Sequence, residues 1–146
     1  MSEKDGGGPP AVVPLLVVDA ANVVGSVPDG WWRDRRAAAE RLRDALVPLA
    51  GQGLGDGADL PPWARTGPLE VVLVVEGAAR GVPGLPQVRV VGAAGSGDDR
   101  VVALVEEAVS ADPHRSCLVV TADRGLRARV TALGALVTGP RAVRPV

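Results

Sequence analysis

The sequence predicts an α/β fold in which helices flank a doubly wound, mostly parallel sheet of five strands. Short apolar runs rich in valine and leucine alternate along the chain with longer segments in which apolar residues recur at helical spacing. The short runs are continuously apolar, as expected of strands that are buried on both faces of a parallel sheet. The chain has 146 residues, a length that fits one domain.

The N-terminal segment differs sharply in composition from the first predicted strand. Residues 5–10 are all Asp, Gly or Pro and cannot contribute to a core. Residues 1–13 are therefore expected to form a flexible tail ahead of one domain that spans 14–146. The apolar run at 15–18 is predicted to be the first strand, and it ends in Asp19.

A helix and a long polar stretch are predicted to follow this strand. Apolar residues recur at helical spacing between residues 31 and 49, and Asp29 or Gly30 is expected to begin the helix. The stretch 51–68 is rich in Gly and Pro and is long for a structureless connection within a domain. It is expected to be a mobile loop that serves as a lid, binds a ligand or is disordered.

The second half of the chain repeats the alternation of strands and helices. Gly134 follows the last predicted helix at the position of a C-terminal cap. Strands are predicted at 69–75, 87–91, 117–121 and 135–138, and helices at 98–110 and 124–133.

Acidic residues follow the predicted strands. Asp19 ends the first strand, Glu76 follows the second, Asp98 and Asp99 follow the loop after the third, and Asp123 follows the fourth. The carboxyl ends of parallel strands meet at one edge of a sheet, where ligands of such folds bind. Carboxylates gathered there repel one another unless protons or a cation neutralise them. Ligands that are all oxygen atoms favour Mg²⁺ or Mn²⁺ over zinc, and such ions support phosphoryl chemistry.

A simpler interpretation of each acid is helix capping, because acids are common where a strand gives way to a helix. Several strand ends that carry an acid make capping alone a weaker explanation of the whole set. Asp98 and Asp99 are hardest to separate, because one could cap the helix and the other bind the ion. We favour Asp99 as the ligand, because the apolar Val102 follows it at the spacing of an inward helix face.

Three segments carry a resemblance to a known family. Residues 17–24, VVDAANVV, resemble the opening of the NYN branch of the PIN-like nuclease superfamily, where a strand ends in Asp and Asn follows three residues later. Residues 97–102, GDDRVV, are similar to that family's acid at the head of the central helix. Residues 119–124, VVTADR, are similar to its strand that ends in Thr or Ser, followed by one residue and then Asp. The resemblance extends over 15–140.

The resemblance implies a strand order of 3-2-1-4-5 and a metal-dependent endonuclease that acts on RNA, with DNA as an alternative. It implies that Asp19, Asp99 or Asp98, and Asp123 bind Mg²⁺ or Mn²⁺. Glu76 stands where many relatives place an Asp, so it could be a longer ligand or a group outside the ligand shell.

The same resemblance assigns supporting roles to three further residues. Asn22 would hold the first loop or contact a phosphate. Thr121 would support the site through its hydroxyl group. Arg124 would steady a phosphate or pair with Asp98.

Composition argues against several other functions. The 16 basic and 17 acidic residues give a net charge of -1, which argues against binding a nucleic acid or an anionic membrane by charge alone. One cysteine, Cys117, and one histidine, His114, exclude an internal disulfide and leave little for a zinc site. No targeting or membrane-spanning segment is expected, so a cytoplasmic location is predicted. A protein partner or a second copy of the chain stays open.

Two alternative functions are compatible with the same acids. A nucleotide (NTP) pyrophosphohydrolase would need the same acids and metal but a closed pocket, and a catalytically inactive domain would bind RNA or a protein.

Trp31 and Trp32 are expected to be core anchors rather than a stacking pair. Trp63, in the long polar stretch, is the better candidate for a substrate contact.

Overall fold

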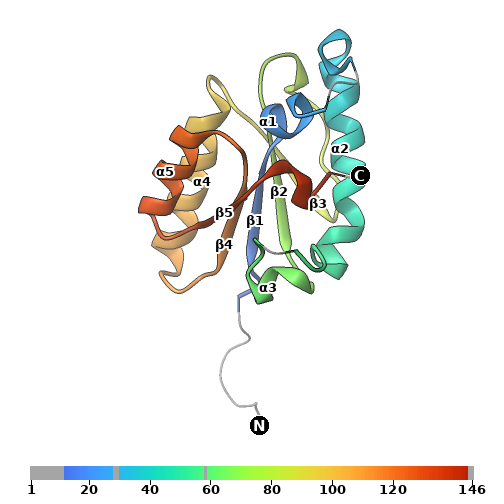
Figure 1. The fold of residues 1–146 in the computed structure, drawn as a ribbon. Helices are drawn as coiled ribbons and strands as arrows, with labels where there is room; N and C mark the ends of the chain where they lie inside the picture. The colour runs from blue at the N-terminus through green and yellow to red at the C-terminus, as the bar shows by residue number, and fades with distance from the viewer. Residues whose placement is uncertain (1–11, 28–29, 58, 145–146) are drawn as a thin grey trace.

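β1 (Leu15–Asp19) is the central strand of a five-stranded, all-parallel sheet in the computed structural model, which describes residues 12–27, 30–57 and 59–144 (Figure 1). The strand order β3-β2-β1-β4-β5 and the α/β class confirm the predicted fold. The other strands are β2 (Glu70–Val75), β3 (Val88–Gly92), β4 (Cys117–Val120) and β5 (Leu136–Thr138).

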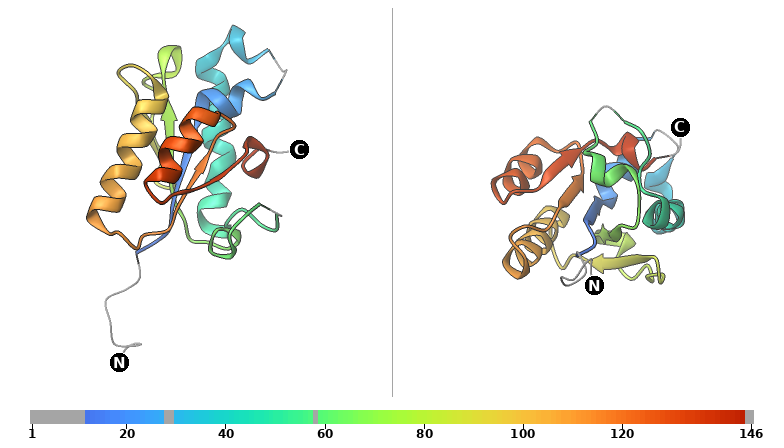
Figure 2. Two further views of the ribbon diagram at one scale, coloured as in Figure 1. Left: turned by 60° about the vertical axis from the view of Figure 1, so that its left-hand side comes forward. Right: turned by 90° about the horizontal axis from the view of Figure 1, so that it is seen from below.

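Helices cover both faces of the sheet (Figures 1 and 2). One face carries α4 (Gly97–Ala111) and α5 (Arg124–Ala132), and the other carries α2 (Arg35–Gln52). In the ranges that the structure describes, no helix is both long and apolar enough to cross a bilayer. The shorter helical elements are α1 (Ala20–Gly25), η1 (Trp31–Arg33), α3 (Pro62–Arg65), η2 (Gly77–Ala79) and η3 (Pro140–Ala142).

The central strand explains why its sequence lacks apolar–polar alternation. Successive side chains of a strand point to opposite faces. Leu16 and Val18 pack in the core on the α2 side, whereas Leu15 and Val17 pack in the core under α4 and α5. Because both faces are covered, every residue of β1 is buried.

The region after β1 departs from the prediction. α1 begins directly at Ala20, where the sequence analysis predicted no helix. The long helix α2 is capped by Asp34, whose carboxylate accepts a hydrogen bond from the Ala37 N–H at 3.0 Å. The expected start at Gly30 is therefore wrong, because Gly30 precedes the short turn η1. Asp29 lies outside the described residues.

The stretch 51–68 is not the structureless loop that its composition predicts. It includes the end of α2 and the whole of α3, and Leu60 and Ala64 are buried in the core. Glycine allows this close packing, since a Cβ atom on Gly67 would lie 2.0 Å from the Gly51 carbonyl oxygen. Small side chains here let two backbone segments touch.

The tryptophans occupy other environments than expected. Trp32 is 54% exposed, so its prediction as a core anchor is wrong. Trp31 is partly exposed and meets the Trp32 ring edge-on, with ring centroids 6.3 Å apart. Trp63 packs against the core in α3, at the end of the sheet where β1 begins (Figure 1), and this placement contradicts its role as a substrate contact at the carboxyl edge.

Nearly all of the predicted tail, residues 1–13, lies outside the described residues. Its last two residues, Val12 and Val13, are exposed. The Val13 carbonyl accepts hydrogen bonds from Arg115 Nε at 3.0 Å and Nη2 at 2.9 Å, so the described chain enters the sheet from an anchored position.

Two leucines that are paired in register across β4 and β5 test how unevenly stability is distributed. Leu118 is fully buried, whereas its partner Leu136 is 49% exposed. We expect Leu118→Ala to lower the free energy of unfolding by about 2–5 kcal/mol, because it leaves a cavity. Leu136→Ala is expected to cost less than about 1 kcal/mol. Urea denaturation measures both changes in the free energy of unfolding. Equal losses of stability would contradict the different burial of the two leucines.

Candidate functional site

Four carboxylates converge at the carboxyl edge of the sheet. Asp19 ends β1, Glu76 follows β2, Asp98 lies in the first turn of α4, and Asp123 precedes α5. Repulsion from Asp98 and Glu76 raises the pKa of Asp19, and repulsion from Asp123 and Glu76 raises the pKa of Asp98. The structure therefore brings these four sequence-predicted residues into one electrostatic cluster.

Asp19 is the buried member of this cluster, with 4% of its surface exposed. Its Oδ2 accepts a hydrogen bond from the Thr121 hydroxyl at 3.1 Å, and its Oδ1 accepts a longer one from the Asn22 N–H at 3.5 Å. Burial is the main cause that raises the pKa of Asp19 from 3.8 to about 6, and these hydrogen bonds oppose the rise. The neighbouring carboxylates add to it.

Thr121 and Asn22 link the first strand to the fourth. The Thr121 hydroxyl donates to Asp19 and accepts from the Asp123 N–H at 3.2 Å. The Asn22 Oδ1 accepts a hydrogen bond from the Ala122 N–H at 2.8 Å. Hydrogen bonds of Asn22 and Thr121 thus connect the segment after β1 to the segment after β4.

Capping and membership of the cluster coexist in two of the acids. Asp123 Oδ1 accepts from the Leu126 N–H at 2.8 Å, so it caps α5, and Asp19 caps α1 through Asn22. A cap is normally exposed at a helix start, however, and burial to 4% with a raised pKa exceeds what capping requires of Asp19. Asp123 is exposed, so its second oxygen faces solvent.

Asp98 and Asp99 point in different directions. The helix cap is neither of them, because the Ser96 hydroxyl oxygen accepts from the Asp98 N–H at 3.1 Å. Asp98 is partly buried, and burial is the main cause that raises its pKa. The side chain of Asp99 is 74% exposed and forms an ion pair with Arg129 at 3.0 Å.

The preference for Asp99 over Asp98 therefore does not match the structure. Val102 was used to place Asp99 on the inward face of the helix. The buried stripe is instead centred on Val101 and Val105, both fully buried, and Asp98 precedes them at the three-residue and seven-residue spacing of one helix face. Asp98 consequently faces the cluster, and Asp99 faces α5.

Gly97, the first residue of α4, leaves room for the Glu76 carboxylate where it lies. A Cβ atom on Gly97 would lie 2.7 Å from Glu76 Oε1, too close for any other residue without movement of the carboxylate. The sequence analysis missed this role of Gly97. The only signal was a glycine directly before an acidic helix start, which is also common in turns that bind nothing.

The arginines of α5 surround the cluster without neutralising it. Arg124 is exposed at the start of α5, and the structure shows no pair between it and Asp98. Arg129 instead lowers the pKa of Asp98 through its charge. Arg127 Nε donates to the Thr121 carbonyl at 2.8 Å and so supports the strand end.

The donor chemistry of the cluster fits a hard divalent cation. All four side chains offer only oxygen, and within the described ranges none of them forms an ion pair with Arg or Lys. The charge of the cluster is therefore compensated only in part, by the effect of Arg129 on Asp98. Across the same ranges no three acidic, His or Cys side chains are yet gathered at ligand distance. Binding an ion would require one or more of the solvent-facing carboxylates to rotate inward.

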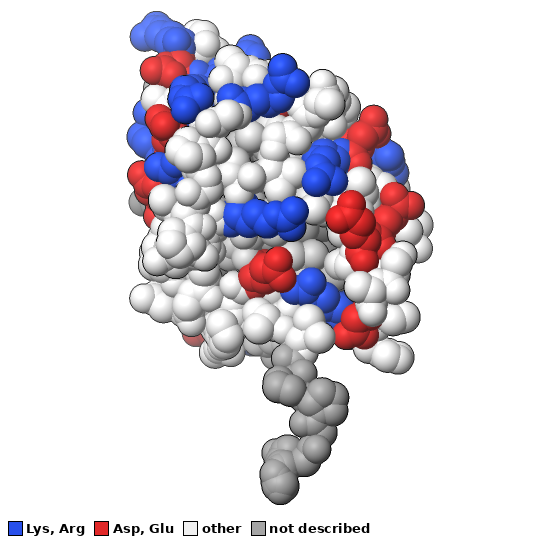
Figure 3. All heavy atoms as spheres, turned by 180° about the vertical axis from the view of Figure 1, so that it is seen from behind, with Lys and Arg blue, Asp and Glu red and all other residues white. Residues whose placement is uncertain are grey.

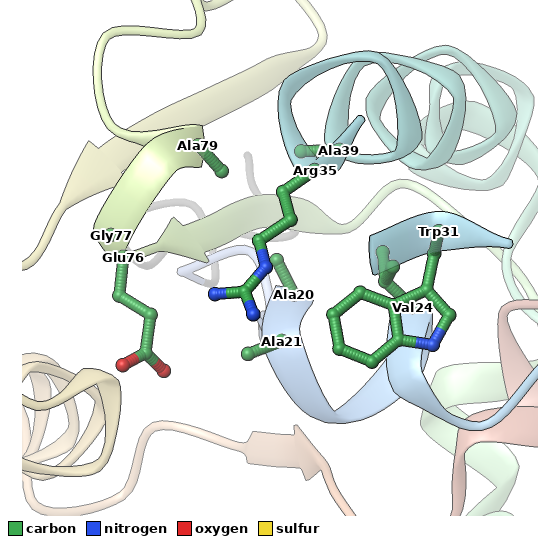
Figure 4. A pocket seen from close by; sticks show the side chains of 9 residues that line it. All are labelled: Ala20, Ala21, Val24, Trp31, Arg35, Ala39, Glu76, Gly77 and Ala79. Carbon is green, nitrogen blue, oxygen red and sulfur yellow. The ribbon is translucent and has the colours of Figure 1, made fainter. Parts of the chain in front are cut away.

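A pocket of about 240 Å³ adjoins the cluster and shares Glu76 with it. It lies between α1, the start of α2 and the segment after β2 (Figure 4). Small side chains leave the space open. The pocket is lined by Ala20, Ala21, Val24, Trp31, Arg35, Ala39, Glu76, Gly77 and Ala79.

Comparisons with known proteins identify structural relatives only. No protein-family model matches the chain, and none of the curated proteins matches it significantly. The chain is similar to the crystal structure of Rae1 (YacP) from Bacillus subtilis, with a TM-score of 0.64, 18% identity, and coverage of 89% of this chain and 71% of that one. A single-substitution mutant of Rae1 gives a TM-score of 0.67 at 16% identity, with coverage of 90% and 72%. The chain thus shares the α/β fold of Rae1, with a five-stranded parallel sheet flanked by helices.

The raised pKa of Asp19 predicts how stability depends on pH in the metal-free protein. The folded-state pKa of about 6 exceeds the ordinary value of 3.8, so the folded protein binds more protons between these two pH values. Stability attributable to Asp19 is therefore lost as pH rises from about 4 to about 6. The shift corresponds to about 3 kcal/mol.

Asp19→Asn should remove this dependence while keeping a residue that caps α1. We expect the free energy of unfolding of the variant, relative to the unmodified chain, to rise by about 3 kcal/mol between pH 4 and pH 7. Urea unfolding in EDTA at several pH values measures the difference, with Asp59→Asn at an exposed position as the control. If the difference in the free energy of unfolding did not change with pH, the raised pKa of the buried Asp19 carboxyl group would be contradicted.

Proposed function

We propose that this protein is a metal-dependent phosphodiester hydrolase that cleaves RNA internally. The observation that carries the proposal is the cluster of Asp19, Glu76, Asp98 and Asp123 around one buried carboxylate at the carboxyl edge of the sheet, where none of the four forms an ion pair with a described residue. Like charges are costly to hold together, so a fold that gathers them favours a cation there. The nuclease-like fold shared with Rae1 supports a phosphodiester substrate.

The four carboxylates would hold Mg²⁺ or Mn²⁺. When bound, such an ion stabilises charge on a phosphate and lowers the pKa of a water molecule. Thr121 and Asn22 keep Asp19 and the β4–α5 loop in place through the hydrogen bonds described above. The exposed Asp123 and Arg124 lie where a strand of RNA would pass, and Arg124 is suited to contact its phosphate.

The proposed reaction is hydrolysis with in-line geometry. A water oxygen forms a bond to phosphorus, and the bond from phosphorus to the 3′ oxygen breaks. The leaving oxygen takes up a proton, so the products carry a 5′-phosphate and a 3′-hydroxyl. Because phosphoryl transfer depends mainly on position and charge stabilisation, the protein's contribution is the fixed set of oxygen ligands.

Adjacent acids in one helix turn supply a matched test of this function. Asp98→Asn is expected to lower the cleavage rate of single-stranded RNA at least about a hundredfold, because it removes a charge-stabilising ligand. Asp99→Asn carries the same change of charge at the neighbouring exposed position and is expected to keep most of the activity. The measurement is cleavage of end-labelled RNA with Mg²⁺, Mn²⁺ or EDTA.

Four results would contradict the proposal. Cleavage that persists in EDTA would contradict the dependence on a metal. Equal activity of the two variants would contradict the role of Asp98 in the site. No cleavage under any condition, with intact binding of RNA, would favour an inactive binding domain. Hydrolysis of nucleoside triphosphates without cleavage of RNA would favour a pyrophosphohydrolase.

Metal binding can also be measured without turnover. Mn²⁺ or Mg²⁺ is expected to raise the melting temperature at pH 7.5, since an ion at 100 times its dissociation constant stabilises the folded state by about 2.7 kcal/mol. The shift should vanish in Asp98→Asn and persist in Asp99→Asn. Differential scanning calorimetry measures it, and equal shifts in both variants would place any bound ion elsewhere.

A further inference from the structure

The pocket that shares Glu76 with the acidic cluster has the size and walls of a site for one small planar group. Its volume of about 240 Å³ is below the roughly 300–1,000 Å³ of pockets that enclose drug-sized ligands. Trp31 and Val24 form an apolar wall, and Arg35 and Glu76 supply the charged groups that line it (Figure 4). The pocket therefore suits a group that is flat, partly apolar and able to form hydrogen bonds.

Arg35 occupies a distinctive position in this pocket. Its guanidinium group lies over the Trp31 ring, with Cζ 5.5 Å from the ring centroid, and reaches across the pocket between Trp31 and Glu76 (Figure 4). Within the described part of the chain it forms no hydrogen bond or ion pair, so its donors are directed at space and solvent. A guanidinium plane stacks on bases and binds phosphate with two parallel hydrogen bonds.

The surroundings of the pocket favour a polyanion over an apolar ligand. Arg33 and Arg36 flank Arg35 in η1 and at the start of α2, and both are exposed. Figure 3 shows basic side chains along the upper edge of the rear face, the edge at which η1 and the start of α2 lie in Figure 1. Arginines and an aromatic ring thus lie beside the pocket, next to the acidic cluster at the same edge of the sheet.

We infer that this pocket binds one unpaired nucleotide of the RNA strand, next to the phosphate that is cleaved. The base lies against Trp31 and the plane of Arg35, and the Arg35 guanidinium contacts the base or its phosphate. This inference rests on the proposed function for the placement of the strand. The binding of a nucleotide in the pocket can be measured independently of cleavage.

A base in this pocket must leave the stack of a duplex. Taking a base out of a helix costs a few kcal/mol unless it is already unpaired. The pocket therefore implies that single-stranded RNA is preferred over duplex RNA. Sequence-tolerant recognition is expected from stacking, since every base presents a flat face to an aromatic ring.

The test measures the dissociation constants of the four ribonucleoside 5′-monophosphates by calorimetry with Mg²⁺ present, with ribose 5-phosphate as the ligand that lacks a base. Arg35→Ala and Trp31→Ala should each weaken nucleotide binding by at least about fivefold, the lower end of the range for loss of one stacking contact. Arg33→Ala removes the same charge beside the pocket but no residue that lines it, so it should weaken binding less than Arg35→Ala does. Trp32→Ala removes a neighbouring ring that does not line the pocket and should leave the constants unchanged. Arg35 is exposed, so its variant is expected to fold even if Trp31→Ala does not.

The outcomes separate this inference from the proposed function. Tight binding of ribose 5-phosphate, or equal weakening by Arg33→Ala and Arg35→Ala, would show attraction by charge alone and overturn the pocket as a base site. Cleavage of RNA by Arg35→Ala at unchanged kcat/KM, with no nucleotide bound by the unmodified chain, would overturn the inference and leave the function standing. Pocket-dependent nucleotide binding without any cleavage would support the inference and overturn the function.

Discussion

The hydrogen bond between the Thr121 hydroxyl and the buried Asp19 carboxylate is the interaction on which the site depends. It joins the ends of the two central strands, β1 and β4, in a place where 4% of Asp19 is exposed. A carboxylate so buried is costly to ionise, and the raised pKa expresses that cost. The same hydroxyl accepts from the Asp123 N–H, so one threonine sets the positions of two acids.

The parallel topology of the sheet is enough to bring the other acids near this pair. Parallel strands end at one edge, and the residue after each strand is carried there by the register of the strands. Glu76 needs one more condition, which is the missing side chain at Gly97. The cluster is therefore a product of strand topology, and the absence of a side chain at Gly97 leaves room for the Glu76 carboxylate.

The carboxyl edge holds the acidic cluster and, next to it, a pocket with Arg35 and Trp31. This arrangement is consistent with a polyanionic substrate whose bases are also contacted by the protein. Among the described residues, Asp19, Glu76, Asp98 and Asp123 form no ion pair, and Arg35 lies in the pocket that Glu76 lines. A net charge of -1 over the whole chain conceals this arrangement. The net charge is therefore a poor guide to binding here, because binding depends on where the charges lie.

The sequence by itself determined the fold class, the strand ends and the acids at those ends, because continuous apolar runs and helical spacing are local patterns. It could not decide between Asp98 and Asp99, because that choice depends on which side of α4 meets the sheet. It also missed α1, the packing of α3 and the exposure of Trp32, because tertiary contacts override local composition there. The pocket beside Glu76 joins residues from four separate segments, and only the tertiary structure brings them together.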